Sequence, residues 1–352
     1  MLQQHGYVVL FGSGETSASG RKVFDWLLSR MPSPVRVAIL ETPAGFELNS
    51  AQVAGRVADF IQHRLQNYAP QVTVVPARKR GTPFSPDNPE IVAPLWQSDL
   101  IFLGPGSPTY AVRQLRDSLA WYTLIARQRL GSAVVLASAA TIAASAHALP
   151  VYEIYKVGED LHWHPGLDFF GTYGLSLVFI PHWNNTEGGA DLDTSRCYMG
   201  QTRFQTLLDM LPAEAVVVGI DEHTALVIDL EAQGCRVLGK GKVTLLREGV
   251  QIQTGRGQEF SITELGPFRI PEPGAGLPPQ IWLRARESAP EESGIAAPEP
   301  GPEVLALLEK REAARARRDW DQADALREQI ERLGWQVLDT RQGSRLEPRQ
   351  AQ

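Results

Sequence analysis

The sequence predicts an α/β protein: an open, doubly wound sandwich with a mostly parallel sheet, an antiparallel edge and a C-terminal αα-hairpin. Short apolar runs alternate along the chain with segments whose apolar residues recur every three or four positions, the spacing of an amphipathic helix. The runs are apolar almost throughout, which is typical of parallel strands covered on both faces. The length of 352 residues fits two domains or one large domain with an appendage.

The first half of the chain supplies the parallel strands and their helices. The predicted strands are residues 7–11, 35–40, 72–75, 100–103, 133–137 and 175–180. The segments with helical spacing are 19–30, 50–67, 108–119 and 121–130. From residue 216 the strands become closely spaced and predict hairpins along one edge of the sheet: 216–220, 224–230, 236–238, 242–246 and 250–254.

A proline-rich stretch follows the sandwich. Nine prolines fall between residues 267 and 302, and this composition predicts an extended linker, least ordered over 288–301. Beyond it, 303–318 and 321–333 keep leucines and alanines at helical spacing, with Asp319 or Asp321 as the cap of the second helix, and 335–339 reads as a short strand. The predicted division is therefore a sandwich over 1–266, a linker over 267–302 and a helical hairpin over 303–352.

Composition narrows the class of protein. The net charge of -6 argues against bulk electrostatic binding of nucleic acid, and no apolar run approaches the roughly 20 residues that span a bilayer. Two cysteines, Cys197 and Cys235, are too few for a disulfide framework, which favours a reducing cytoplasm. The first apolar run is too short for a signal peptide. We expect a cytoplasmic protein that makes no membrane contact, and its oligomeric state stays open.

The turns after parallel strands converge on one edge of the sheet, so they predict the site. Ser138 directly follows the strand 133–137 among alanines, the small neighbours that a nucleophile elbow requires. The turn Gly104-Pro105-Gly106-Ser107 offers backbone N–H donors beside it, which together with the N–H of Ala139 can bind a developing oxyanion. His182 follows the next strand and is the predicted general base.

A third residue has to orient the histidine. Glu153 is the leading candidate, with Asp168 and Glu187 as alternatives. Lys156 and Arg196, together with Asn184, are predicted to shape a pocket for a charged substrate, since cations bind carboxylates. His162 and His164 lack further ligands at a recognised spacing, so no metal is predicted. The Gly12-x-Gly14 turn has Ser17 at the third glycine position of a dinucleotide fingerprint, so no organic cofactor is predicted either.

Several motifs between residues 7 and 246 resemble one family of enzymes. They are Gly12-Ser13-Gly14-Glu15, Phe102-Leu103-Gly104-Pro105-Gly106, the Ser138 turn, His182 and Gly219-Ile220-Asp221-Glu222-His223-Thr224-Ala225-Leu226. The chain is similar here to the serine peptidases that include cyanophycinase and aspartyl dipeptidase, built on a class I glutamine amidotransferase-like sandwich. The resemblance implies Ser138 as nucleophile, His182 as base, Gly106 and Ala139 as oxyanion donors and Glu153 as the third member. The family's elbow has a glycine two positions before and after the serine, where this chain has Leu136 and Ala140.

The C-terminal segment resembles a second family. Arg311-Glu312, Ala314-Arg315, Asp319-Trp320, Ala323-Asp324, Arg327, Leu333-Gly334 and Asp339-Thr340 match the tail of cysteinyl-tRNA synthetase. This resemblance implies a contact with tRNA or a translation protein through residues 303–347. The chain lacks the nucleotide-binding signature and zinc cysteines of a synthetase, so it is not expected to charge tRNA.

Together these features predict a serine hydrolase that cleaves a peptide or isopeptide bond in a small peptide-like substrate through an acyl-enzyme. The alternative from another class is a catalytically silent sandwich that holds an acidic ligand and is linked to tRNA or a translation partner through its C-terminal hairpin. An amidase or amidotransferase subunit would share the fold but usually employs cysteine, and position 138 is serine.

Overall fold

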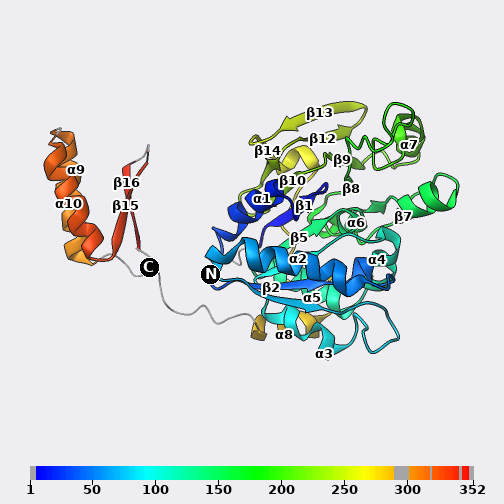
Figure 1. Cartoon of the computed structure of the whole chain (residues 1–352), viewed down its shortest axis with the longest axis horizontal. Helices are drawn as coiled ribbons and strands as arrows, with labels where there is room; N and C mark the ends of the chain where they lie inside the picture. Colours follow the sequence, from blue (N-terminus) through cyan, green and yellow to red (C-terminus); the bar gives the residue numbers. More distant parts are fainter. Residues whose placement is uncertain (1–4, 289–300, 318, 341–342, 349–352) are drawn as a thin grey trace. The chain divides into compact units, whose positions relative to one another are not determined.

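The computed structural model describes residues 5–288, 301–317, 319–340 and 343–348. It divides into two compact units, Met1–Ala289 and Pro290–Gln352. The proposed linker over 288–301 lies almost wholly outside the described residues. Figure 1 shows the strands and helices of both units.

A sheet of eight strands forms the centre of the large unit, in the order β14-β11-β10-β1-β5-β4-β2-β3. Five of its strands run parallel, as predicted, and their bounds are β1 (Val8–Phe11), β2 (Arg36–Leu40), β3 (Gln71–Val75), β4 (Leu100–Leu103) and β5 (Ala133–Ala137). Three antiparallel strands extend it beyond β1: β10 (Thr224–Asp229), β11 (Gly234–Gly239) and β14 (Glu259–Ser261). The predicted antiparallel edge is therefore present.

The remaining closely spaced strands do not join that edge. A separate four-stranded sheet has the order β13-β12-β9-β8, with β8 (Leu177–Ile180), β9 (Val216–Ile220), β12 (Lys242–Arg247) and β13 (Val250–Gly255). The prediction that residues 175–180 lie in the main sheet is thus wrong, because β8 pairs in parallel with β9. The apolar run of β8 indicates that the strand is buried on both faces, but it does not indicate which sheet the strand joins. A two-stranded ladder joins β6 (His147–Ala148) and β7 (His164–Pro165).

Two layers cover the main sheet. Apolar residues of α1 (Ala18–Leu28) and α2 (Ser50–Arg64) pack on one face, and α5 (Leu119–Arg129) and the second sheet pack on the other. The side chains of β5 alternate between these layers, with Leu136 on one face and Ala137 on the other. The other α-helices of this unit are α3 (Pro89–Val92), α4 (Pro108–Leu115), α6 (Ala139–Ala143), α7 (Gly200–Asp209) and α8 (Pro279–Ser288). Short 3-10 helices span Thr42–Ala44, Gln66–Tyr68, Ala93–Gln97, Gly171–Tyr173 and Ile262–Leu265, and a π-helix spans Glu153–Val157.

The first part of the predicted linker packs on the large unit instead of extending away from it. Ala285 of α8 is fully buried in a cluster with Trp96 and Ala126. The buried guanidinium of Arg129 donates a hydrogen bond to the carbonyl of Ala275 at 2.6 Å. Proline content alone suggested a linker, but apolar residues of α8 stand at helical spacing and bury one face.

The small unit has its own core. It contains α9 (Pro302–Ala316), α10 (Trp320–Arg332) and a hairpin of β15 (Trp335–Thr340) with β16 (Gly343–Pro348). Val304, Ile330, Trp335 and Val337 are buried together, and the Asp319 side chain caps α10 as predicted. The second strand of the hairpin was not predicted, because its residues lack an apolar alternation.

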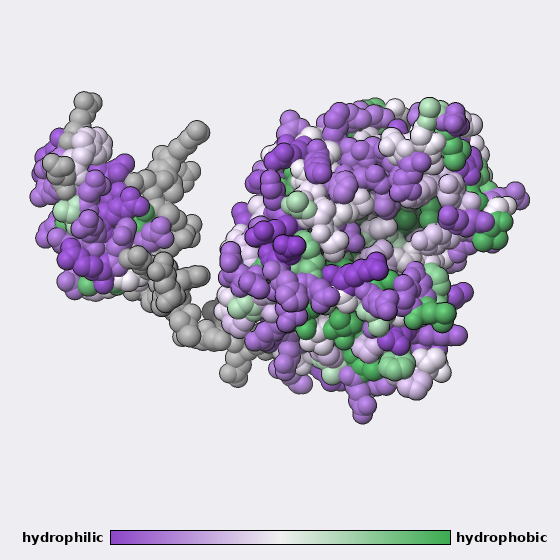
Figure 2. All heavy atoms as spheres, in the orientation of Figure 1, coloured by the Kyte–Doolittle hydropathy of each residue, from purple (hydrophilic) through white to green (hydrophobic). Residues whose placement is uncertain are grey.

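Polar residues cover most of the face of the large unit seen in Figure 2, and apolar residues lie there in smaller groups. None of the helices in the described ranges is long and apolar enough to cross a membrane.

Candidate active site

Ser138 lies in the sharp turn between β5 and α6. Its backbone has φ 51° and ψ −108°, a combination that residues with a side chain rarely adopt. Its N–H donates a hydrogen bond to the carbonyl of Phe11 at 3.3 Å, and the neighbouring Ala137 and Ala139 are buried. Strain of this kind persists only where the surrounding structure enforces it, and it clusters at functional sites. The turn therefore has the geometry of a nucleophile elbow.

The elbow accommodates the absence of both family glycines. Leu136 directs its side chain into the core between the main sheet and the second sheet, where it is 1 % exposed. The hydroxyl of Thr141 donates to the carbonyls of Leu136 at 3.0 Å and Phe11 at 3.1 Å, which braces the turn from inside. Ala140 is buried beside the turn without displacing it. The strained conformation thus rests on packing and on these two carbonyl contacts.

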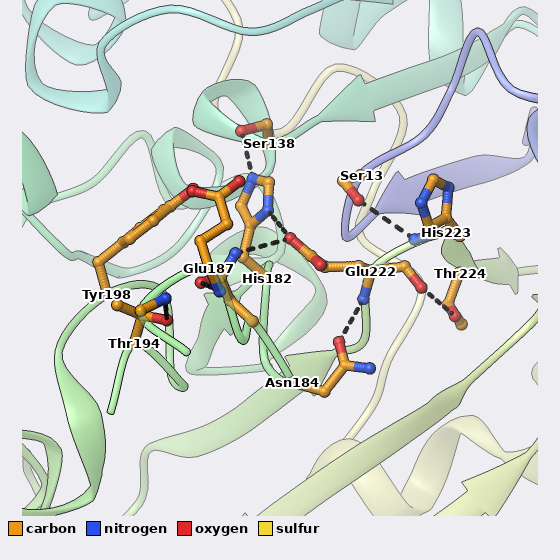
Figure 3. Close-up of polar contacts among 12 residues, drawn as sticks. Ser13, Ser138, His182, Asn184, Glu187, Thr194, Tyr198, Glu222, His223 and Thr224 are labelled. Atoms are coloured by element: carbon orange, nitrogen blue, oxygen red, sulfur yellow. Dashed lines mark hydrogen bonds and ion pairs between the residues drawn. The ribbon is translucent and has the colours of Figure 1, made fainter. Parts of the chain in front are cut away.

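A chain of hydrogen bonds runs from Ser138 through His182 to Glu222 (Figure 3). The hydroxyl of Ser138 is 3.0 Å from Nε2 of His182, and Nδ1 of the same ring is 2.9 Å from Oε1 of Glu222. His182 follows β8, and its N–H donates to the carbonyl of Gly12 at 3.2 Å, which ties the second sheet to the first turn of the main sheet. Serine, imidazole and carboxylate in this order form the arrangement of a catalytic triad.

Glu222 is fixed by two asparagines. The side-chain amide of Asn185 donates to Oε1 of Glu222 at 3.0 Å, and Oδ1 of Asn184 accepts from the Glu222 N–H at 2.8 Å. The hydrogen bond from His182 holds the pKa of Glu222 below its usual value, although burial opposes the shift. Glu222 is therefore a carboxylate at neutral pH, ready to orient the imidazole.

Two backbone N–H groups flank the serine. Those of Gly106 and Ala139 donate no hydrogen bond to any described residue, and both residues line the cavity that contains Ser138. Gly106 has φ +148°, and a Cβ there would collide with the carbonyl of Pro43, so the turn requires glycine. Free N–H groups beside a nucleophile are suited to bind the oxygen of a tetrahedral intermediate.

The cavity in front of Ser138 has a volume of about 290 Å³. Tyr152, Tyr155 and Tyr198 supply aromatic walls, and Lys156 and Glu187 supply one charge of each sign. Oε2 of Glu187 accepts a hydrogen bond from the Tyr198 hydroxyl at 3.0 Å. Cys197 also lines the cavity, but burial raises the pKa of its thiol to about 12, which makes it a poor nucleophile beside Ser138.

The structure does not bring Glu153 to the histidine. Its Oε1 accepts a hydrogen bond from the Thr109 hydroxyl, and its side chain lines a neighbouring cavity of about 1010 Å³. Glu222 occupies the place expected for Glu153, Asp168 or Glu187. The predicted chain order placed the orienting acid between Ser138 and His182, with Glu187 just beyond as an alternative, whereas Glu222 lies 40 residues after the histidine. Its signal was present in the motif of residues 219–226, the most specific of the family resemblances.

Two of the three predicted substrate-binding residues also lie elsewhere. Asn184 supports the Glu222 backbone, and Arg196 lines a different cavity with Trp183, while Lys156 does line the cavity of Ser138. His162 and His164 line the same large cavity as Glu153. Among the described residues there is no group of three or more histidines, cysteines or acids suited to hold a metal ion.

The large unit has the fold of a crystallised peptidase. Its structure is similar to that of a peptidase from an acI-B1 Actinobacterium, with a TM-score of 0.59 and 22 % sequence identity over 74 % of this chain and 98 % of that one. A putative peptidase E protein from Listeria monocytogenes also aligns, with a TM-score of 0.42 and 15 % identity over 71 % of this chain and 98 % of that one.

The C-terminal segment has separate relatives. Residues 297–345 match the family described as cysteinyl-tRNA ligase anticodon binding domain. A cysteine–tRNA ligase from Opitutus terrae is 52 % identical over 46 residues, and one from Burkholderia lata is 54 % identical over 43 residues. These matches cover 13 % and 12 % of this chain, which spans only 10 % and 9 % of the ligases. The chain thus joins a unit with a peptidase fold to a segment similar to part of the cysteinyl-tRNA ligases.

Proposed function

We propose that this protein is a serine hydrolase that cleaves a peptide or isopeptide bond in a small substrate through an acyl-enzyme. The observation that carries the proposal is the Ser138–His182–Glu222 relay at a strained turn, with two unused N–H groups beside the serine. A nucleophile, a base, an orienting acid and oxyanion donors are the groups that acyl transfer needs, and backbone strain of this kind is typical of functional sites, which supports the proposal over a binding protein.

In the proposed mechanism the Ser138 oxygen attacks the scissile carbonyl while Nε2 of His182 takes the hydroxyl proton. Glu222 stabilises the imidazolium through its contact with Nδ1. The N–H groups of Gly106 and Ala139 bind the oxyanion of the tetrahedral intermediate. When that intermediate collapses, His182 returns the proton to the leaving amine, and an ester remains on Ser138. Water, activated by the same histidine, then hydrolyses the ester and regenerates the free serine.

The size and charges of the cavity support a small, charged substrate. About 290 Å³ accommodates a few residues of peptide, and Lys156 and Glu187 offer partners for a carboxylate and an ammonium group. We therefore propose a short peptide or isopeptide that carries both charges near the scissile bond. Arg196 has no part in this recognition, because it lines another cavity.

A fluorophosphonate probe tests the nucleophile directly. We expect it to label the wild-type protein on Ser138 and not to label Ser138→Ala. A panel of dipeptides and β-linked isopeptides, with free and blocked termini, then tests the substrate class, and hydrolysis is expected only for members with both free charges. Equal labelling of both proteins would refute the assignment of Ser138.

The match of residues 297–345 supports a further role for the small unit. We propose that residues 303–347 contact tRNA or a protein of translation, and that the protein works in the cytoplasm, where its two free thiols are stable. Fluorescence anisotropy with labelled tRNA, comparing the full chain with a chain ending at Ser288, tests the RNA contact. We expect binding only by the full chain.

A further inference from the structure

Two segments that line the catalytic cavity, around residues 182–183 and 196–198, also line another cavity, called here the second cavity. It has a volume of about 570 Å³ and is lined by α7, the β12–β13 hairpin, Trp183 and Arg196. The residues adjoining these two in sequence face the other way, since His182, Cys197 and Tyr198 line the cavity of Ser138. The same two short segments of backbone therefore separate the two cavities.

Hydrogen bonds hold these two segments together. The N–H of Cys197 donates to the carbonyl of His182 at 3.3 Å, and the N–H of Arg196 donates to the carbonyl of Trp183 at 2.9 Å. Three consecutive residues, Arg196, Cys197 and Tyr198, have φ values of 57°, 57° and 67°, a left-handed turn that side chains disfavour. Strained segments of this kind are typical of ligand clamps and switches. Arg196 and Tyr198 belong to the same turn, and the ring centroid of Tyr198 is 6.0 Å from that of His182.

Arg196 presents its charge to the second cavity. Its guanidinium lies 3.9 Å from the centroid of the Trp183 ring and donates one hydrogen bond, to the Trp183 carbonyl at 3.1 Å. It forms no ion pair with any described carboxylate. Burial lowers its pKa, and the fields of Asp193 and Asp221 oppose that shift. Both acids already accept backbone N–H groups, from Ser195 and Gln201 and from Lys242 respectively.

One side of the cavity suits an apolar chain, and the other side carries polar residues: Gln201, Gln205, Asp209, Glu248 and Gln251. Its apolar wall consists of Phe204, Leu208, Leu211, Ala215, Val217 and Leu246. The other arginine in the lining, Arg247, already pairs with Glu248 at 3.3 Å. One unpaired guanidinium beside an apolar wall is complementary to a carboxylate on a short hydrocarbon chain.

We propose that this cavity is an effector site for a small carboxylate with an apolar chain, bound with its carboxylate on Arg196. Binding of the carboxylate alters the conformation of the Arg196–Tyr198 turn and so changes the reactivity of Ser138. The binding itself is independent of the proposed hydrolase activity, and only its effect on Ser138 depends on that activity.

Calorimetric titration of the full chain with hexanoate and with hexanamide, its uncharged counterpart, tests the binding. We expect hexanoate to bind at least about tenfold more tightly, since a hydrogen bond to a charged group is stronger than one between neutral groups. Arg196→Gln should remove that preference, while Arg196→Lys keeps part of it. Arg247→Gln is the matched control in the same cavity, and because Arg247 is already paired we expect it to change hexanoate affinity by less than about threefold.

Two further variants locate the ligand. Ala213→Trp, at the exposed rim of the second cavity, should block hexanoate, and Lys156→Gln, in the catalytic cavity, should not. Saturating hexanoate should also change the rate of fluorophosphonate labelling of Ser138 by about threefold or more in the wild type and leave it unchanged in Arg196→Gln. Equal affinity for hexanoate and hexanamide, or loss of binding in Lys156→Gln alone, overturns the site. Unchanged labelling with normal binding overturns the coupling, and a protein that is never labelled refutes the proposed function without touching the binding result.

Discussion

Ser138 keeps its hydroxyl at the sheet edge in a backbone conformation that suits glycine better than serine. We predict that Ser138→Gly abolishes hydrolysis and raises the free energy of unfolding by about 1 kcal/mol, because relief of strain exceeds the added flexibility of the unfolded chain. Ser138→Ala keeps the strain and should be equally inactive with unchanged stability. Urea unfolding of the wild type, Ser138→Gly and Ser138→Ala measures the three free energies of unfolding. A Gly variant less stable than the Ala variant would contradict the strain at residue 138.

Two glutamates near the site have different neighbours, which gives a matched pair of substitutions. Glu222→Gln removes the charge that orients His182 and should lower kcat by about 10³- to 10⁴-fold. Glu153→Gln alters a residue that contacts Thr109, and it should lower kcat by less than about fivefold. Steady-state rates of both variants on one peptide substrate provide the measurement. The reverse ranking would restore Glu153 as the orienting acid.

The lowered pKa of Glu222 also predicts a stability effect with a definite sign. A carboxyl whose pKa is lower in the folded state stabilises the fold above its ordinary pKa of 4.5, and that contribution is lost as pH falls through the folded value. The thermal midpoint of the wild type should therefore fall more steeply below about pH 4.5 than that of Glu222→Gln. Melting curves from pH 6 to about pH 3 test this. Parallel pH profiles would show that the hydrogen bond from His182 is not retained in solution.

At the scale of elements, α8 packs on the large unit although the proline content around it suggested a linker. Ala285 is fully buried against Trp96 and Ala126, whereas Leu283 is 56 % exposed on the same helix. Ala285→Glu buries an unpaired charge and should destabilise the large unit by about 3 kcal/mol or more, while Leu283→Glu should change its stability by less than about 0.5 kcal/mol. Differential scanning calorimetry compares the two. Equal effects would mean that α8 does not pack on the unit.

The parallel strands and the serine turn were predictable because each carries a local signal. An apolar run such as 133–137 is followed at once by small residues that only a tight turn requires. The split into two sheets was not predictable, because the choice of partner for 177–180 depends on pairing with 216–220, far along the chain. Glu222 belongs to a recognisable motif, but its role was missed because its contact with His182 joins residues 40 positions apart, and the sequence does not show that pairing.

At the scale of the whole molecule, the two compact units predict separable stability. A chain ending at Ser288 keeps α8 and should retain the melting transition and the hydrolysis of the full chain. A chain ending at Gly266 loses the contacts of α8 with Trp96 and of Ala275 with Arg129, and it should melt several degrees lower. Limited proteolysis of the full chain is expected to cut between residues 288 and 301, where proline, glutamate and alanine prevail. Loss of activity in the chain that ends at Ser288 would show that the small unit helps to build the site.

The central position of β1 bears on how the protein is made. This strand pairs with β5 on one side and with β10 on the other, so the sheet stays open until residues 224–229 have left the ribosome. At translation rates of about 5–20 residues per second, the stretch from His182 to Asp229 takes roughly 2–10 s to appear. For most of that interval the nascent chain carries Ser138 and His182 but not yet Glu222, the carboxylate that orients the histidine. The proposed relay is therefore incomplete during synthesis, and it forms only after β10 has paired with β1 in the main sheet.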